Sequence, residues 1–249
     1  MDLNIEGKTV LITGAAKGIG RGIALAAASQ GAHIALHYQN SELEARETAK
    51  LIEKSGGTAV LIKGDLTSIE DVENMKIDIK QKLGSVNGIV NNAGWVQNKS
   101  FFDYKPEEWK REVDVCFYGV LHLAYTFLPE MMEKTQGKFI NIVGDSARTG
   151  DRNLIISGAA RNGAISFLKS LAKEVGRKNI QCNTVSLGLI DKGLNYDTAT
   201  IEKIIQQYPL KRLGKVDDVV GIILFLLSSW SDWMTGQVIS VNGGHSMLG

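Results

Sequence analysis

Short apolar runs rich in β-branched residues alternate along the chain with longer stretches in which apolar positions recur at helical spacing. These runs occupy Thr9–Thr13, His33–Tyr38, Thr58–Lys63, Gly88–Asn91, Lys138–Val143, Ile180–Leu187 and Gln237–Val241. Most are apolar almost throughout, as strands covered by helices on both faces must be. The alternation predicts βαβ units and one parallel sheet of about seven strands. No repeat, low-complexity segment or linker interrupts it, so we expect a single α/β domain over residues 1–249.

Polar residues mark the expected starts of several helices. The segments Ser41–Glu44 and Thr67–Glu70 fit the capping box, in which the first and last side chains each bond a backbone N–H group. The segment Pro106–Glu108 fits a first helical turn, because proline lacks an N–H group that would go unpaired there and acids favour the helix dipole. The sequence therefore predicts that helices begin at these places.

The charge balance and the cysteine count exclude several classes of protein. The chain has 249 residues with 28 Lys and Arg against 27 Asp and Glu, and its net charge of +1 provides no basic field for nucleic acid or a membrane surface. Its two cysteines, Cys116 and Cys182, predict neither a disulfide framework nor a zinc site. The acidic start and the longest apolar stretch, Val219–Leu227, predict neither a signal peptide nor a membrane helix of about 20 residues. We therefore expect a cytoplasmic protein without a metal.

The 27 glycines against three prolines suit a fold with many tight strand-to-helix turns. One glycine cluster follows the first expected strand and leads into an alanine-rich helix, in the run Thr13-Gly14-Ala15-Ala16-Lys17-Gly18-Ile19-Gly20. Backbone N–H groups at such a turn, with the positive end of the helix dipole, bind pyrophosphate. The spacing is GxxxGxG rather than GxGxxG. Its place between a strand and a helix favours a nucleotide site over a simple tight turn.

Further motifs accompany this turn along essentially the whole chain. They are Asp65 after the third strand, Asn91-Asn92-Ala93-Gly94, Asn183 and Gly188 in NTVSLG, Arg212-Leu213-Gly214, and the ending from Phe225 to Gly244. Together with TGxxxGIG, they resemble the short-chain dehydrogenase/reductase (SDR) family. The resemblance implies an open, doubly wound Rossmann-type sheet that binds NAD or NADP at the carboxyl ends of its strands. It also implies that Asp65 lies near the adenine and that Asn91, Ala93 and Gly94 line the cofactor cleft.

The residues after the second strand leave the choice between NAD and NADP open. NAD-binding proteins usually carry an acid about 20 residues beyond the glycines, and here the strand ends His37-Tyr38-Gln39-Asn40. NADP-preferring members of the family often have an arginine where Asn40 stands. Lys17 either contacts a 2′-phosphate or is a solvated lysine. Because the first possibility exists, the prediction weakly favours NADP.

The resemblance also implies which positions carry the chemistry of active members. These use a Ser to polarise the carbonyl, a Tyr to transfer the proton, a Lys to lower the pKa of that Tyr and hold the ribose, and an Asn to position a water. The flanking motifs register these positions on Gly144, Ser157, Arg161 and Cys116, so all of them are altered. A serine alcohol is a far weaker acid than a phenol, whose pKa is about 10, and arginine keeps its charge. Cys116 is expected to be a small buried hydrophobe.

Two further departures fall at the same end of the site. Leu187-Gly188 stands where the family has Pro-Gly, and Lys192 stands where a threonine usually contacts the cofactor. The adenine side of the motif is therefore retained, whereas the reaction side is lost. We predict a catalytically degenerate member that binds NAD or NADP weakly or not at all.

The leading hypothesis is a non-catalytic subunit that assembles with an active SDR subunit, in a heterotetramer. The resemblance places the contacts on helices around Pro106–Met132 and Asn162–Val175. Their apolar residues face either a partner or the sheet: Phe117, Val120, Leu123, Phe127, Phe167, Leu168 and Leu171. The run Gly144–Gly150 is similar to that of 3-hydroxyacyl-CoA-type dehydrogenases of anaerobic aromatic degradation. One of these, in the benzylsuccinate route, pairs an active with an inactive subunit.

Two other hypotheses remain open at this point. A free-standing oxidoreductase would need relocated acid/base groups, for which Asp145, Ser146 and Tyr118 are the candidates. For Ser146 a solvated loop position is the favoured interpretation, and for Tyr118 a packed helix position. A nucleotide-binding sensor, alone or as a homo-oligomer, would need no catalytic groups at all.

Overall fold

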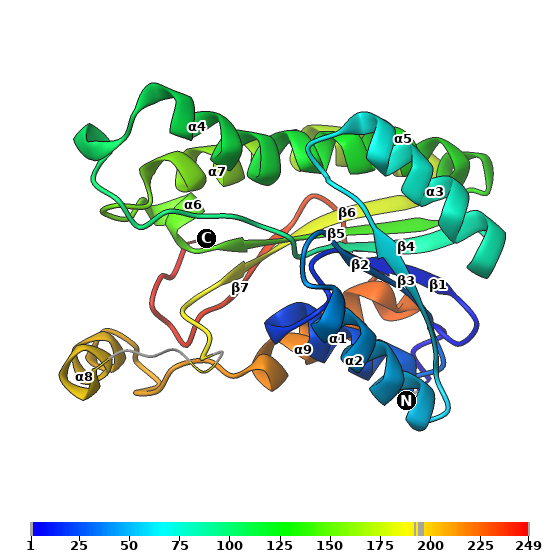
Figure 1. The fold of residues 1–249 in the computed structure, drawn as a ribbon, viewed down its shortest axis with the longest axis horizontal. Helices are drawn as coiled ribbons and strands as arrows, with labels where there is room; N and C mark the ends of the chain where they lie inside the picture. The colour runs from blue at the N-terminus through cyan, green and yellow to red at the C-terminus, as the bar shows by residue number, and fades with distance from the viewer. Residues whose placement is uncertain (1, 192, 194–196, 249) are drawn as a thin grey trace.

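The apolar runs form one parallel sheet in the computed structural model, which describes residues 2–191, 193 and 197–248 (Figure 1). The sheet order is β3-β2-β1-β4-β5-β6-β7. The strands are β1 (Thr9–Ile12), β2 (His33–Tyr38), β3 (Thr58–Lys63), β4 (Val86–Asn91), β5 (Gly137–Gly144), β6 (Ile180–Leu187) and β7 (Val238–Val241). The predicted class, a doubly wound α/β fold with seven parallel strands, is confirmed. No predicted strand end is displaced by more than two residues.

Helices cover both faces of the sheet, so each face has its own apolar core. Figure 1 shows α1, α2 and α9 on one face and α3, α4, α5 and α7 on the other. The helices are α1 (Gly18–Ser29), α2 (Glu42–Lys54), α3 (Ile69–Leu83), α4 (Pro106–Val113), α5 (Gly119–Glu133), α6 (Ser146–Thr149), α7 (Ile155–Val175), α8 (Thr198–Gln206) and α9 (Val216–Leu227). A π-helical turn, Asp114–Tyr118, joins α4 to α5.

Helices α2 and α4 begin where predicted, after Ser41 and at Pro106, and the cap of α3 lies one residue later than predicted. The Ser41 side chain makes no hydrogen bond to the first turn of α2. Helix α3 is capped by Ser68 rather than Thr67, because the Ser68 hydroxyl accepts from the Asp71 N–H at 3.1 Å. The Thr67 hydroxyl instead donates to the Asp65 carboxylate at 2.8 Å.

The apolar residues of the two long helices mostly serve the core. Val120, Leu123, Phe127 and Leu168 are buried, and Phe117, Phe167 and Leu171 are partly buried against the same cluster. The interpretation that they face the sheet is therefore confirmed for most of them. Two large aromatic side chains of the π-helical turn and α5 are exposed: Tyr118 is 47% exposed and Tyr125 is 76% exposed.

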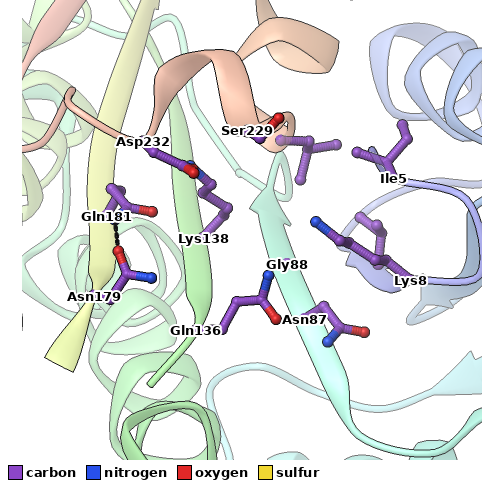
Figure 2. A pocket seen from close by; sticks show the side chains of 12 residues that line it. Ile5, Lys8, Asn87, Gly88, Gln136, Lys138, Asn179, Gln181, Ser229 and Asp232 are labelled. Atoms are coloured by element: carbon purple, nitrogen blue, oxygen red, sulfur yellow. Dashed lines mark hydrogen bonds and ion pairs between the residues drawn. The ribbon is translucent and has the colours of Figure 1, made fainter. Parts of the chain in front are cut away.

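The amino edge of the sheet holds a small polar cavity of about 40 Å³ (Figure 2). Lys8, Asn87, Gln136, Lys138, Asn179 and Gln181 line it. The Lys138 ammonium lies 2.6 Å from the Asp232 carboxylate. Burial lowers the pKa of Lys138, and Asp232 opposes that shift. A polar space of this size suits one or two buried waters, so we treat it as structural.

Candidate functional site

The glycine turn between β1 and α1 lies at the carboxyl edge of the sheet. Gly14 and Gly18 have φ angles of +60° and +58°, in the left-handed region where a side chain would be strained. Helix α1 begins at Gly18, and the unpaired N–H groups of its first turn therefore lie at the turn. Gly18 and Ile19 both line a cavity at this edge, so the helix N-terminus faces it as an anion site requires.

Gly20 brings α1 close to the turn. A Cβ atom at Gly20 would collide with the Gly14 carbonyl oxygen and would lie 2.6 Å from Asn92 Nδ2. The Asn92 amide donates to the carbonyl oxygens of Thr13 and Gly14, at 3.1 and 3.0 Å. The glycine turn is thus held from the β4 side by Asn92, and only glycine fits at position 20.

Asn91 lies beneath the cavity rather than in its wall. Its Oδ1 accepts from the Thr13 hydroxyl at 2.7 Å, and its Nδ2 donates to Asn141 Oδ1 at 2.8 Å. The Thr13 hydroxyl oxygen accepts in turn from the N–H groups of Asn92 and Ala93. This buried network joins the ends of β1, β4 and β5. Asn91 therefore supports the site from below and does not line the cleft, as the resemblance implied it would.

The cavity along this edge has a volume of about 680 Å³, within the usual size range of ligand pockets. Its lining includes seven of the predicted cofactor residues, namely Gly14, Lys17, Gly18, Ile19, Asp65, Ala93 and Gly94. The rest of the lining comes from the ends of β2, β3 and β4, from α4 and from the π-helical turn. Of the residues that the structure describes, none from β5, α7 or β6 lines it.

Among the lining residues that the sequence did not single out are Trp95 and Arg111. The Arg111 guanidinium lies over the Trp95 ring, 4.5 Å from the ring centroid. Trp95 directly follows Gly94, so the motif at 91–94 could have predicted that Trp95 lies at the cavity. Arg111 comes from α4, and no spacing rule joins it to the glycine turn.

His37 connects the glycine turn to β3. Its Nδ1 accepts from the Gly14 N–H at 3.2 Å, and its Nε2 lies 3.1 Å from the Gly64 carbonyl oxygen. Together these contacts require the neutral ring with its proton on Nε2. Burial lowers the pKa of His37 to about 4, although the Gly64 carbonyl and the Asp65 charge both oppose that shift.

We expect the free energy of unfolding to fall as the pH drops from about 6.5 to about 4. In this range the unfolded chain protonates His37 and the folded chain does not, so the unfolded state binds more protons and stability decreases with acid. The accumulated loss is on the order of 3 kcal/mol at pH 4. Urea unfolding between pH 4 and pH 7 measures it. His37→Gln should flatten this part of the profile, whereas His33→Gln on the same strand should not. An unchanged profile in His37→Gln would contradict the assignment.

The end of β2 presents only neutral groups to the cavity. Tyr38, Gln39, Asn40 and Ser41 line it. The Lys17 ammonium lies 3.7 Å from the Glu44 carboxylate, and its side chain is 68% exposed. Glu44 offsets the charge that would attract a 2′-phosphate, which weakens the argument for NADP.

Arg161 lies at the reaction end of the site. Its Nη2 lies 2.7 Å from the position a Cβ atom would take at Gly94, and its Nη1 lies 3.7 Å from the same position at Gly144. Arg161 as a whole is partly buried. It forms no hydrogen bond or ion pair with any residue that the structure describes. Gly144 and Arg161 are therefore brought together, as the registered motif predicts.

The side chains at the other two altered positions donate hydrogen bonds to backbone carbonyl oxygens of the protein. Cys116 is buried in the π-helical turn, as predicted, and its Sγ donates to the Trp95 carbonyl oxygen at 3.3 Å. Ser157 is buried near the start of α7, and its hydroxyl donates to the Leu154 carbonyl oxygen at 3.3 Å. Neither group offers an acidic proton to a bound carbonyl. Leu187 is buried at the end of β6, and Lys192 lies outside the described residues.

Ser146 corrects one expectation. It is 8% exposed at the start of α6 rather than solvated, and its Oγ lies 3.4 Å from the position of a Cβ atom at Gly144. Its hydroxyl has no hydrogen-bond partner within the described part of the chain. The Ser146 hydroxyl therefore lies close to the place of the missing family serine.

The other two candidate relocated groups serve other purposes. The Asp145 carboxylate is buried and accepts from Ser186, Asn242 and Ser246 at 2.6, 2.6 and 2.8 Å. It holds the segment after β7 against the ends of β5 and β6. Tyr118 is not packed as expected, since its half-exposed ring lies beside Phe117 and His122.

Metal or membrane chemistry finds no support in the described ranges. No group of three His, Cys, Asp or Glu side chains among those residues is placed to hold a metal ion. No helix described by the structure is both long and apolar enough to span a bilayer.

Comparison with known proteins agrees with the fold and the glycine turn. A family profile described as Enoyl-(Acyl carrier protein) reductase matches residues 14–246. The chain is 32% identical to a 3-oxoacyl-[acyl-carrier-protein] reductase of Staphylococcus epidermidis, over 96% of this chain and 99% of that protein. It is 33% identical to the protein of the same name from Vibrio cholerae, over 99% of this chain and 100% of that protein.

A solved structure gives the same result. The fold is similar to that of a gluconate 5-dehydrogenase from Burkholderia cenocepacia in complex with NADP and tartrate, with a TM-score of 0.92 and 27% identity. The match covers 98% of this chain and 97% of the other. All three relatives carry the names of reductases or dehydrogenases. The comparisons therefore favour the oxidoreductase alternative over the hypothesis of a catalytically degenerate subunit.

Proposed function

Because the chain belongs to the short-chain dehydrogenase/reductase family, we propose that it is a subunit of an NAD(P)-dependent oxidoreductase in which a second SDR subunit performs the hydride transfer. One observation carries the proposal: the positions that act on the carbonyl in active members hold Gly144, Ser157, Arg161 and Cys116. Carbonyl reduction needs a proton donor within hydrogen-bond reach of the substrate oxygen. The Ser157 hydroxyl is buried and bonded to the Leu154 carbonyl, so it does not supply one.

The partner we propose is an active member of the same family. The exposed aromatic rings of Tyr118 and Tyr125 on the outer side of α5 support a protein contact there, since tyrosine is favoured at interfaces. The similarity of Gly144–Gly150 to the hydroxyacyl-CoA-type dehydrogenases supports a partner of that type, as in the benzylsuccinate route.

A turnover assay tests the absence of chemistry. We expect the purified chain to oxidise NADH or NADPH with 3-oxoacyl thioesters or simple ketones no faster than a blank, because a positioned acid alone accounts for roughly 10²–10⁴-fold in rate. The variant Cys116→Asn/Gly144→Ser/Ser157→Tyr/Arg161→Lys should gain measurable turnover. Circular dichroism must first show that this variant is folded. Turnover by the unmodified chain, lost in Ser146→Ala, would refute the proposal.

The second candidate is a free-standing oxidoreductase, and the position of Ser146 is the observation that favours it. Its hydroxyl has no hydrogen-bond partner among the described residues and lies beside Gly144, and the relatives are reductases by name. The same assay decides between the two candidates.

Co-expression of the chain with an active SDR encoded beside it should give a stable hetero-oligomer. A homotetramer that excludes such a partner would count against the subunit proposal.

A further inference from the structure

The small polar cavity at the amino edge of the sheet is separate from the cavity at the glycine turn. Its wall comes from the beginnings of β1, β4, β5 and β6, and none of its residues lines the cavity at the carboxyl edge. The side chains of Ile5, Val10 and Leu227 form an apolar part of this wall. Charges beside such a wall are screened less than charges on an open surface.

The charged groups at this cavity do not cancel. Its wall contains Lys8, Lys138 and Asp232, so two ammonium groups face one carboxylate. Lys138 is 8% exposed and donates to Ser231 Oγ and Asp232 Oδ1, at 3.3 and 2.6 Å, which leaves one of its three N–H donors. The Lys8 ammonium forms no hydrogen bond or ion pair with a described residue. Within the described part of the chain, one positive charge at the cavity is therefore uncompensated.

The two ammonium groups are close enough to affect each other. Burial lowers the pKa of Lys138, Asp232 raises it, and the charge of Lys8 lowers it further. The Asp232 side chain is 56% exposed, so water screens part of its attraction. An anion between the two ammonium groups would offset both the cost of burying Lys138 and its repulsion by Lys8.

Neutral side chains add N–H donors to this space. Asn87 Oδ1 accepts from the Thr9 N–H at 2.9 Å, so the amide nitrogen of Asn87 is left for a ligand. The Gln136 side chain makes no hydrogen bond with a described residue. Figure 2 shows the Lys8 ammonium and the Gln136 carboxamide extending into the space beside Lys138. A ligand there meets donors from three separate elements of the fold.

The volume of the cavity restricts the size of that ligand. A space of about 40 Å³ has room for one or two waters, and therefore for one ion of similar size. Phosphate and organic carboxylates have several heavy atoms and need more space. Water fits, but it leaves the positive charge uncompensated.

We infer that the cavity binds one small monovalent anion, of the size of chloride, between the ammonium groups of Lys8 and Lys138. The anion is a structural group, because it stabilises the folded chain in which these two lysines face each other. The inference goes beyond the proposed function and does not depend on it.

Urea unfolding of the whole chain in sodium chloride and in sodium methanesulfonate, at equal ionic strength, tests this inference. Methanesulfonate is also a monovalent anion, but it is too large for the cavity. Each tenfold increase in chloride above its dissociation constant should raise the folding equilibrium constant about tenfold. Lys8→Met keeps an unbranched side chain without its charge, and it should remove this dependence. Gln136→Ala should weaken chloride binding by roughly tenfold.

Lys50→Met is the matched control, because this exposed lysine of α2 is not part of the cavity wall and its substitution removes the same charge. Broadening of the chloride NMR line by the folded protein measures binding directly, and it should decrease in Lys8→Met but not in Lys50→Met. Equal unfolding midpoints of the unmodified protein in the two salts would overturn the inference and leave the cavity to water. So would an unchanged chloride response in Lys8→Met or, if that variant does not fold, unchanged line broadening in Gln136→Ala.

Discussion

Gly20→Val is expected to abolish nucleotide binding and to lower the free energy of unfolding by about 3 kcal/mol or more. A Cβ atom at this position would collide with the Gly14 carbonyl oxygen and would crowd the Asn92 amide. The collision involves backbone rather than the end of a flexible side chain, so α1 must move away from the glycine turn. That movement displaces the helix N-terminus from the cavity and breaks the hydrogen bonds from Asn92 to Thr13 and Gly14.

Chemical denaturation and titration with NADH measure the two effects. Gly221→Ala is the matched control, because its Cβ atom would meet nothing within 4 Å on α9. That substitution should raise stability by about 0.5–1 kcal/mol, since glycine is a poor helix former. A Gly20→Val protein that keeps both its stability and its nucleotide affinity would show that the turn tolerates a side chain.

Asp145→Ala is expected to lower the free energy of unfolding by about 3 kcal/mol. The buried carboxylate accepts hydrogen bonds from Ser186, Asn242 and Ser246. Removing it leaves the Ser186 hydroxyl without an acceptor and removes one acceptor of the Asn242 amide. The segment after β7 should then detach from the sheet at lower denaturant concentration than the rest of the fold. Hydrogen exchange of the N–H groups of 238–246 would detect that detachment.

Asp151→Ala controls for the loss of a carboxylate on the other side of the short helix α6. Asp151 is exposed, and its substitution should change stability by less than about 0.5 kcal/mol. Asp145→Asn should fall between the two, because an amide keeps one acceptor oxygen. If Asp145→Ala were as stable as Asp151→Ala, the carboxylate would not hold the segment, and Asp145 would again be a candidate for chemistry.

Most strands were predictable because nearly all of their residues are buried. Ile180–Leu187 is buried at every position and begins and ends with an apolar residue, although polar side chains lie between them. Helix starts were less predictable, because neighbouring side chains compete for the same N–H groups. Asp65 engages the Thr67 hydroxyl, so the cap of α3 moves to Ser68, and no spacing rule contains that competition.

The site residues that belong to a continuous sequence motif were predictable. Those that separate helices and strands bring to the site were not. The glycine turn and the run after β4 lie together as expected, because both follow strands of one sheet edge. The burial of Ser146 follows from the short helix α6, and the place of Arg111 follows from its stacking on Trp95. Both depend on the direction of a side chain in three dimensions, and sequence periodicity does not contain it.

The buried network of Thr13, Asn91 and Asn141 beneath the cavity bears on how such motifs are read across a lineage. These side chains bond one another and the adjacent backbone, so their substitution harms folding whether or not a nucleotide is bound. Under the proposed function, selection for a folded chain would preserve TGxxxGIG and NNAG, while positions 144, 157 and 161 would be free to drift. An intact glycine motif in this family is then evidence of ancestry and foldability, and evidence of cofactor use must come from the other end of the site.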